Sequence, residues 1–199
     1  MKRSLMTLTA AAMLAVGIGS AAMAADKPIT IRAVGTWGSL TNYQKHEGPF
    51  WNDKIAKASN GSIIGEIKPQ TALGLKGFEI MRLVKNGVFD FAFGLPGYVA
   101  AENAVFEGGD LSSVTQDIET ERKVAEAYFP TLEKAFAEIY NAKLMMLYPF
   151  PSQTLWCNGE VKGLADLKGK KIRVYSTTLG DFVEGDGGTS VTVPFAEVI

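Results

Sequence analysis

A regular alternation of strand and helix patterns constrains the fold of this chain more than any other feature of its sequence. Short apolar runs predict strands over residues 29–34, 62–68 and 88–93, and apolar positions at helical spacing predict helices over residues 43–59 and 75–85. A strand, a helix and another strand in succession form a right-handed crossover between two parallel strands. The first half of the chain therefore predicts an α/β fold, with helices packed on a parallel sheet.

The middle of the chain continues this pattern less regularly. A helical region is predicted over residues 117–140, and Pro130 is expected to kink it or to divide it in two. Strands are predicted over residues 143–147 and 154–157. The second of these strands would hold Cys157 as a buried, inert thiol.

The last part of the chain carries clear local signals for further elements. A helical turn is predicted over residues 162–168, and strands are predicted over residues 171–174 and 190–193. Ser176 is the predicted N-cap of a helix between these two strands, because a serine hydroxyl accepts hydrogen bonds from the first turn of a helix. Pro194 suits the first position of another helix. These elements predict a second α/β unit.

Two prolines in the run Tyr-Pro-Phe-Pro-Ser, residues 148–152, indicate a stiff crossing between two domains. We therefore predict a first α/β lobe over residues 25–150 and the beginning of a second α/β lobe over residues 151–199. The helix that begins at Pro194 extends for a single turn before residue 199. The second lobe is accordingly expected to be incomplete in this chain.

The first 24 residues have the pattern of a secretory signal peptide. Lys2 and Arg3 precede an apolar run over residues 8–18, and small residues follow at Ala22 and Ala24. The alternative is a membrane anchor, but the run is short for a bilayer span and rich in alanine and glycine. Cleavage after residue 24 would leave the mature protein in the periplasm.

Composition argues against several classes of function. Residues 1–24 hold two of the 20 basic residues and none of the 21 acidic residues, so the mature chain is acidic and offers nothing that attracts nucleic acid. Cys157 and His46 are too few for a Cys/His zinc site or for a disulfide. No motif for a cofactor or metal occurs. Because a carboxylate pair needs no motif, an exported enzyme acting on a small acid or a glycan is the alternative interpretation.

Three candidate binding residues lie at the ends of predicted strands. Trp37 and Tyr98 follow the first and third of these strands, and Arg173 lies near the end of the strand over residues 171–174. Open α/β sheets bind ligands at the carboxyl ends of their strands. A guanidinium there matches a carboxylate with two parallel hydrogen bonds. The structural alternatives are a partly buried loop aromatic for Trp37, side-chain packing for Tyr98 and a surface cation for Arg173.

Three short motifs near the end of the chain carry a family resemblance. They are Leu-Lys-Gly-Lys-Lys-Ile-Arg-Val at residues 167–174, Gly-Gly-Thr at residues 187–189 and Val-Pro-Phe-Ala-Glu-Val at residues 193–198. Together they resemble the signature of the TRAP transporter solute receptors of the dicarboxylate-binding type. The resemblance implies a periplasmic binding protein with two α/β lobes and a cleft between them. It also implies that Arg173 clamps a substrate carboxylate and that Phe195 lines the pocket.

One departure from the family pattern bears on the ligand. Many members carry a second arginine on the segment ahead of these motifs, where this chain has Ser152 and Gln153. Neutral side chains at that part of the site favour a small organic acid with one carboxylate, a monocarboxylate, over a dicarboxylate. The resemblance further implies that TRAP membrane permease subunits receive the bound acid, and a receptor that reports to a membrane sensor is the alternative.

Overall fold

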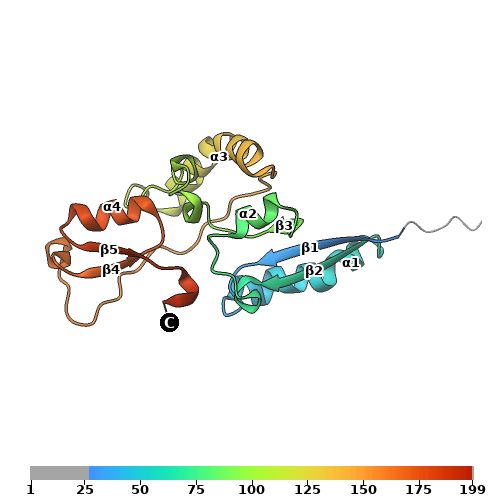
Figure 1. Ribbon diagram of the computed structural model, residues 1–199, viewed down its shortest axis with the longest axis horizontal. Coiled ribbons are helices and arrows are strands. Elements are labelled where there is room, and N and C mark those ends of the chain that lie inside the picture. The colour runs from blue at the N-terminus through green and yellow to red at the C-terminus, as the bar shows by residue number, and fades with distance from the viewer. Residues whose placement is uncertain (1–26, 199) are drawn as a thin grey trace, which may run out of the picture.

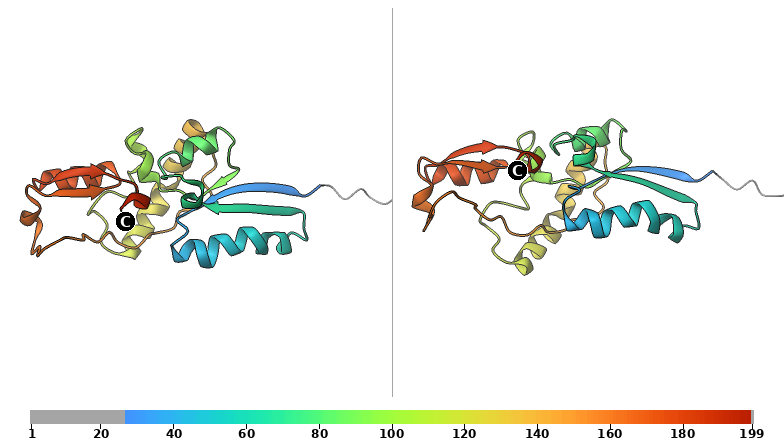
Figure 2. Two further views of the ribbon diagram at one scale, coloured as in Figure 1. Left: turned by 60° about the horizontal axis from the view of Figure 1, so that its bottom comes forward. Right: turned by 90° about the horizontal axis from the view of Figure 1, so that it is seen from below.

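The computed structural model describes residues 27–198 and contains two separate parallel sheets (Figure 1). The first sheet has three strands in the order β2-β1-β3, and the second has two strands, β4 and β5. Helices lie beside both sheets in all three views (Figures 1 and 2). The predicted α/β class is confirmed. The predicted signal peptide, residues 1–24, lies outside the described residues.

The first sheet is built around β1 (Ile29–Gly35), which pairs in parallel with β2 (Ile63–Pro69) along its whole length. β1 is buried only at its carboxyl end, over its last three residues. β3 (Phe91–Ala92) is shorter than the predicted strand because the carboxylate of Asp90 accepts the backbone N–H of Arg32 at 2.9 Å and also binds its guanidinium. A side chain therefore takes the place of the strand carbonyl that would extend the ladder.

The helix predicted over residues 43–59 is present but irregular. It consists of two π-helical turns, Tyr43–Glu47 and Phe50–Lys54, followed by α1 (Ile55–Ala58). It packs closely on the sheet, since a Cβ added at Gly65 of β2 would overlap the carbonyl oxygen of Trp51. Glycine at this position is what allows the helix to approach the strand.

The next helix, α2 (Ile80–Lys85), begins five residues later than the sequence predicts. Gly77 has a φ of 105°, a left-handed conformation that interrupts any helix starting at Leu75. The residues after β2 form a 3₁₀ turn instead, Gln70–Leu73. This turn places Gln70 beside the end of β1.

A single helix, α3 (Ile118–Tyr140), runs through Pro130 without ending, so of the two effects expected of this proline, a kink or a division, the division does not occur. Two features outweigh the missing hydrogen bond at Pro130. Asp117 caps the first turn by accepting the N–H groups of Glu119 and Thr120. The buried face of the helix packs in one apolar cluster whose buried members are Val99, Phe106, Leu132, Ala135, Phe136 and Tyr140.

The strands predicted over residues 143–147 and 154–157 do not form. Within residues 27–198 no other strand pairs with either segment, and an isolated strand leaves its backbone N–H and C=O groups without partners. Leu144 and Leu147 still pack against the α3 cluster. Cys157 is exposed, so the prediction of a buried thiol is wrong. The side chain of Trp156 next to it is 89% exposed.

The second unit follows the predicted order of elements. A 3₁₀ turn, Leu164–Leu167, leads to β4 (Lys171–Val174), α4 (Thr177–Gly185) and β5 (Thr189–Thr192). β4 and β5 are parallel. In the part of the chain that the structure describes, no helix combines the length and the apolar character needed to cross a membrane. The predicted lobe boundary near residue 150 stays a prediction.

Candidate functional site

Arg173, the third residue of strand β4, is a half-buried cation. Its Nε donates a hydrogen bond to the carbonyl oxygen of Val193 at 2.7 Å, which fixes one edge of the guanidinium. Its Cζ lies 5.6 Å from the ring centroid of Tyr175, within the range of a cation–π contact. Among residues 27–198, no carboxylate forms an ion pair with Arg173. The Nη edge is therefore without an anionic partner in the described chain.

Three aromatic side chains, Trp37, Tyr98 and Phe195, form what we call the aromatic cluster. Trp37 and Tyr98 are 4% and 6% exposed, and their ring centroids are 6.3 Å apart. The ring of Phe195 lies 5.0 Å from that of Trp37, and its backbone N–H donates to the hydroxyl oxygen of Tyr98 at 3.1 Å. The cluster thus joins the loops that follow β1, β3 and β5, and the C-terminal 3₁₀ turn, Phe195–Glu197, lies near the loop after β1 (Figures 1 and 2).

Arg173 and the aromatic cluster act on one another through Tyr98. Burial raises the pKa of Tyr98, whereas the hydrogen bond from Phe195 and the positive charge of Arg173 oppose this rise. The hydroxyl of Tyr98 is therefore neutral at physiological pH. It lies close enough to the guanidinium of Arg173 for the positive charge to affect its pKa. The structure brings together four of the six residues that the sequence singles out: Arg173, Phe195, Trp37 and Tyr98.

The other two predicted residues, Ser152 and Gln153, are exposed and lie in an extended segment. Over residues 27–198, neither forms a hydrogen bond with Arg173 or with the aromatic cluster. The same segment does reach the cluster through Phe150, whose ring centroid is 6.1 Å from that of Trp37. The roles of Ser152 and Gln153 stay predictions.

A buried carboxylate holds the loop that carries Trp37. Both oxygens of Glu47 accept hydrogen bonds from Thr36, Oε2 from the backbone N–H and Oε1 from the hydroxyl, each at 2.8 Å. Glu47 is 5% exposed, and burial raises the pKa of its carboxyl above the ordinary value of 4.5 in spite of these hydrogen bonds. The loop is thereby locked onto the helix over residues 43–58.

Substituting Glu47 by glutamine is expected to remove a specific pH dependence of stability. A carboxyl whose folded-state pKa is raised binds its proton more tightly in the folded state, so its contribution to stability is complete below about pH 4.5 and is lost as the pH rises through the folded-state pKa. The unfolding free energy of the wild type, minus that of Glu47→Gln, should therefore increase as the pH falls from 7 toward 4.5. Urea unfolding at several pH values measures this difference, and a difference that stays constant would contradict the assignment.

A second buried carboxylate ties α4 to the chain that follows Tyr98. Oε1 of Glu107 accepts the backbone N–H of Thr178 at 3.0 Å and its hydroxyl at 2.8 Å, and Ser112 adds a hydrogen bond to the same hydroxyl. The sequence predicts that Ser176 caps α4. Ser176 occupies the N-cap position but its side chain makes no capping bond, and Glu107 caps the helix instead. Sequence reasoning missed Glu107 because its partner lies 71 residues away.

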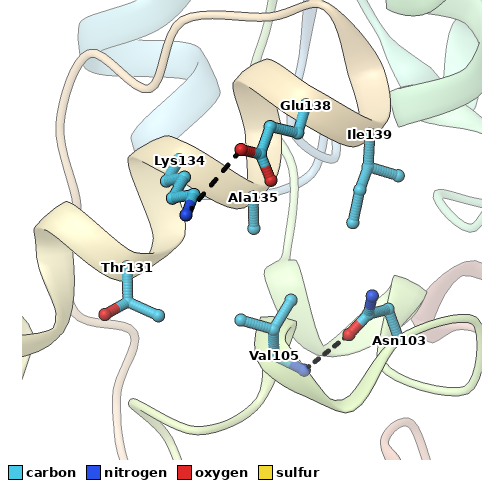
Figure 3. A pocket seen from close by; sticks show the side chains of 7 residues that line it. All are labelled: Asn103, Val105, Thr131, Lys134, Ala135, Glu138 and Ile139. Atoms are coloured by element: carbon cyan, nitrogen blue, oxygen red, sulfur yellow. Dashed lines mark hydrogen bonds and ion pairs between the residues drawn. The ribbon is translucent and has the colours of Figure 1, made fainter.

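A surface depression of about 240 Å³ lies elsewhere, between α3 and the 3₁₀ turn that follows Asn103 (Figure 3). Lys134 and Glu138 face one another on its helical wall at 3.9 Å. The lining residues are Asn103, Val105, Thr131, Lys134, Ala135, Glu138 and Ile139. They include neither Arg173 nor the aromatic cluster. In residues 27–198, no three His, Cys, Asp or Glu side chains gather closely enough to hold a metal ion.

Solved structures share this fold. An extracytoplasmic solute receptor of Bordetella pertussis that binds pyroglutamic acid is 24% identical, with a TM-score of 0.75 over 85% of this chain and 55% of its own. A TRAP solute-binding protein from a marine metagenome, specific for pyroglutamate, is 23% identical, with a TM-score of 0.76 over 86% and 56%. A TRAP protein of Pseudomonas putida F1 with bound D-glucuronate is 20% identical, with a TM-score of 0.73 over 85% and 56%.

The comparisons give the share of the solved structures that the chain spans and the family to which it belongs. It spans about 55% of the length of the solved structures that it matches. No curated protein sequence matches it. The sequence profile described as "Bacterial extracellular solute-binding protein, family 7" matches residues 34–199, which confirms the resemblance to TRAP receptors. The chain therefore belongs to the bacterial extracellular solute-binding proteins of family 7.

Proposed function

We propose that this protein is a periplasmic receptor that binds a small organic acid through Arg173 and delivers it to a TRAP-type membrane permease. One observation carries the proposal: a half-buried guanidinium, without a carboxylate partner in residues 27–198, lies beside aromatic side chains at the ends of parallel strands. Ligands of open α/β folds bind at these strand ends. Family membership supports the class of function, since the family consists of extracellular solute-binding proteins.

The orientation of Arg173 determines how it would hold a carboxylate. Because Nε is bound to the carbonyl oxygen of Val193, the two terminal nitrogens remain for the ligand. One N–H bond of each terminal nitrogen points in the same direction, so the two can donate to the two oxygens of one carboxylate. The carbonyl of Val193 thereby keeps the guanidinium oriented before the ligand arrives, which lowers the entropy cost of binding.

The ligand that fits this arrangement is a monocarboxylate with an apolar face. Pyroglutamate, orotate and glucuronate, which the related solved receptors bind, each have a single carboxylate group. The family resemblance aligns the neutral residues Ser152 and Gln153 with the position at which many members carry a second arginine, which supports a ligand with one carboxylate. The half-buried ring of Phe195, which packs against Trp37, offers an apolar surface to the body of such an acid.

Contacts between the two sheet units indicate how the ligand would be enclosed. The N–H of Phe195 bonds to Tyr98, and Lys76 pairs with Glu197 at 2.5 Å. Both pairs connect the turn after β5 to residues that follow strands of the first sheet. We propose that these contacts break when the lobes open for the acid and form again when they close around it, which would shield the ion pair with Arg173 from water.

A titration with acids of one and two carboxylates tests this proposal. The protein is purified with all of the chain that its gene encodes and titrated calorimetrically with pyroglutamate, pyruvate and D-glucuronate, and with succinate and malate. We expect at least one monocarboxylate to bind about tenfold or more tightly than either diacid, which is a difference of about 1.4 kcal/mol. Stronger binding of the diacids would contradict the ligand class.

The recovered ligand serves as the control for catalysis. A receptor returns the acid unchanged after prolonged incubation, and mass spectrometry of the released ligand shows this directly. A chemically altered acid would instead indicate an exported enzyme. Uptake of the bound acid into vesicles that contain the permease subunits, measured with and without the receptor, tests delivery.

A further inference from the structure

Two polar atoms close to the aromatic cluster are buried without a hydrogen-bond partner. They are Nε1 of Trp37, a donor, and Oε1 of Gln70, an acceptor. The two residues are 4% and 2% exposed. A buried polar group that has lost its hydrogen bond to water destabilises a protein by about 1–3 kcal/mol, so a pair of them beside a binding residue calls for a partner that is absent from the described chain.

The two residues come from the carboxyl ends of neighbouring parallel strands. The backbone N–H of Gln70 donates to the carbonyl oxygen of Thr36 at 3.1 Å, and the N–H of Gly38 donates to the hydroxyl of Thr71 at 3.2 Å. The loop with Trp37 and the turn with Gln70 are therefore bound to one another on both sides of Trp37. These bonds hold the backbones that carry the two side chains next to one another at one edge of the sheet.

Both residues border the ring of Tyr98. The indole of Trp37 meets this ring edge to face. Gln70 meets it at Gly77, where an added Cβ would lie 3.1 Å from Oε1 of Gln70 and would overlap the tyrosine ring. Tyr98 in turn accepts the N–H of Phe195 and lies within the field of Arg173. Tyr98 therefore lies between the residues that carry the two unpartnered atoms and the proposed carboxylate-binding residue, Arg173.

Resting on the proposed function, we propose that Gln70 and Trp37 determine the specificity of the receptor by binding an amide group of the acid. Oε1 of Gln70 accepts the N–H of the ligand, and Nε1 of Trp37 donates to its carbonyl oxygen. The acid selected is then one that carries a donor and an acceptor together, away from the carboxylate that Arg173 holds. A site built to hydrogen-bond a group discriminates strongly against analogues that lack it, because its own polar atoms would stay unpaired.

The test compares two acids of the same ring size. Pyroglutamate has a carboxylate and a ring amide, and cyclopentanecarboxylate has the carboxylate alone. We expect the wild-type protein to bind pyroglutamate at least about tenfold more tightly. Gln70→Leu should weaken pyroglutamate binding about tenfold and leave cyclopentanecarboxylate within about twofold. Gln116→Leu, the same change at an exposed glutamine whose side-chain amide donates to the carbonyl oxygen of Ser113, is the matched control.

A second variant removes the donor without removing the ring. Trp37→Phe should reduce the preference for pyroglutamate in the same way as Gln70→Leu, and it keeps the test valid if Gln70→Leu fails to fold by circular dichroism. Wild-type protein that binds the two acids equally, or that does not bind pyroglutamate, overturns the inference. So does unchanged pyroglutamate affinity in either folded variant.

The outcomes also separate this inference from the proposed function. If Arg173→Ala loses affinity for both acids while Gln70→Leu and Trp37→Phe behave as the wild type, the carboxylate site stands and the amide site fails. If Arg173→Ala binds both acids as the wild type does, the proposed function itself fails.

Discussion

Replacing Arg173 by alanine is expected to lower the affinity for the organic acid by about 30-fold to several thousandfold, which corresponds to about 2–5 kcal/mol. The substitution leaves the carboxylate of the ligand in a largely dry site without its charged partner. Isothermal titration calorimetry with the strongest acid from the titration panel measures the loss. The fold should persist, because the half-buried side chain makes few contacts: a hydrogen bond to Val193, a cation–π contact with Tyr175 and a charge interaction with Tyr98.

Two further variants sharpen this prediction. Arg173→Lys keeps the charge but cannot supply two parallel donors, so its affinity should fall between those of the wild type and of Arg173→Ala. Arg122→Ala removes an exposed arginine from α3 and is the matched control for the loss of one positive charge. Equal affinities of wild type and Arg173→Ala would rule out the carboxylate clamp.

Replacing Trp37 by alanine is expected to destabilise the protein by about 3–5 kcal/mol. Its side chain is 4% exposed and meets the rings of Tyr98, Phe150 and Phe195 edge to face. Truncation leaves a cavity between three loops that the indole otherwise joins, and the surrounding rings can fill it only in part. Urea unfolding followed by circular dichroism measures the change in unfolding free energy.

The controls for Trp37 separate packing from chemistry. Phe50→Ala removes an aromatic side chain that is 45% exposed and should cost about 1 kcal/mol or less. Trp37→Phe retains most of the ring volume, so it should restore most of the lost stability while still lacking the indole N–H. A Trp37→Ala variant as stable as the wild type would show that the indole does not hold the three loops together.

Hydrophobic periodicity predicted the helices and strands that are stabilised by their own hydrogen bonds or by pairing with a neighbouring element. β1, β2, β4 and β5 form where the sequence indicates, because each has a parallel partner within the chain. The same periodicity predicted strands over residues 143–147 and 154–157, which do not form because a strand requires a neighbouring strand to bond its backbone. At Pro130, packing of the buried face of α3 overrides a local signal that ends most helices.

The residues of the candidate site also fall into those that the sequence predicted and those that it did not. Trp37, Tyr98 and Arg173 were identifiable from sequence because each follows or ends a predicted strand, and parallel strands bring such positions to one edge. Phe195 came from the family motif. Gln70 carries no such signal, since the burial of its side-chain oxygen near Gly77 is set by the folded chain and not by the strand pattern.

By itself, then, the sequence determined the α/β class, the order of the strands that have partners and the presence of an arginine at a strand end. The tertiary structure alone decided that Glu47 and Glu107 are buried supports for the two units and that the Nη edge of Arg173 has no anionic partner in the described chain. The reason is physical. Periodicity records which face of an element is apolar, whereas the burial and pairing of a polar side chain depend on residues that only the folded chain brings near.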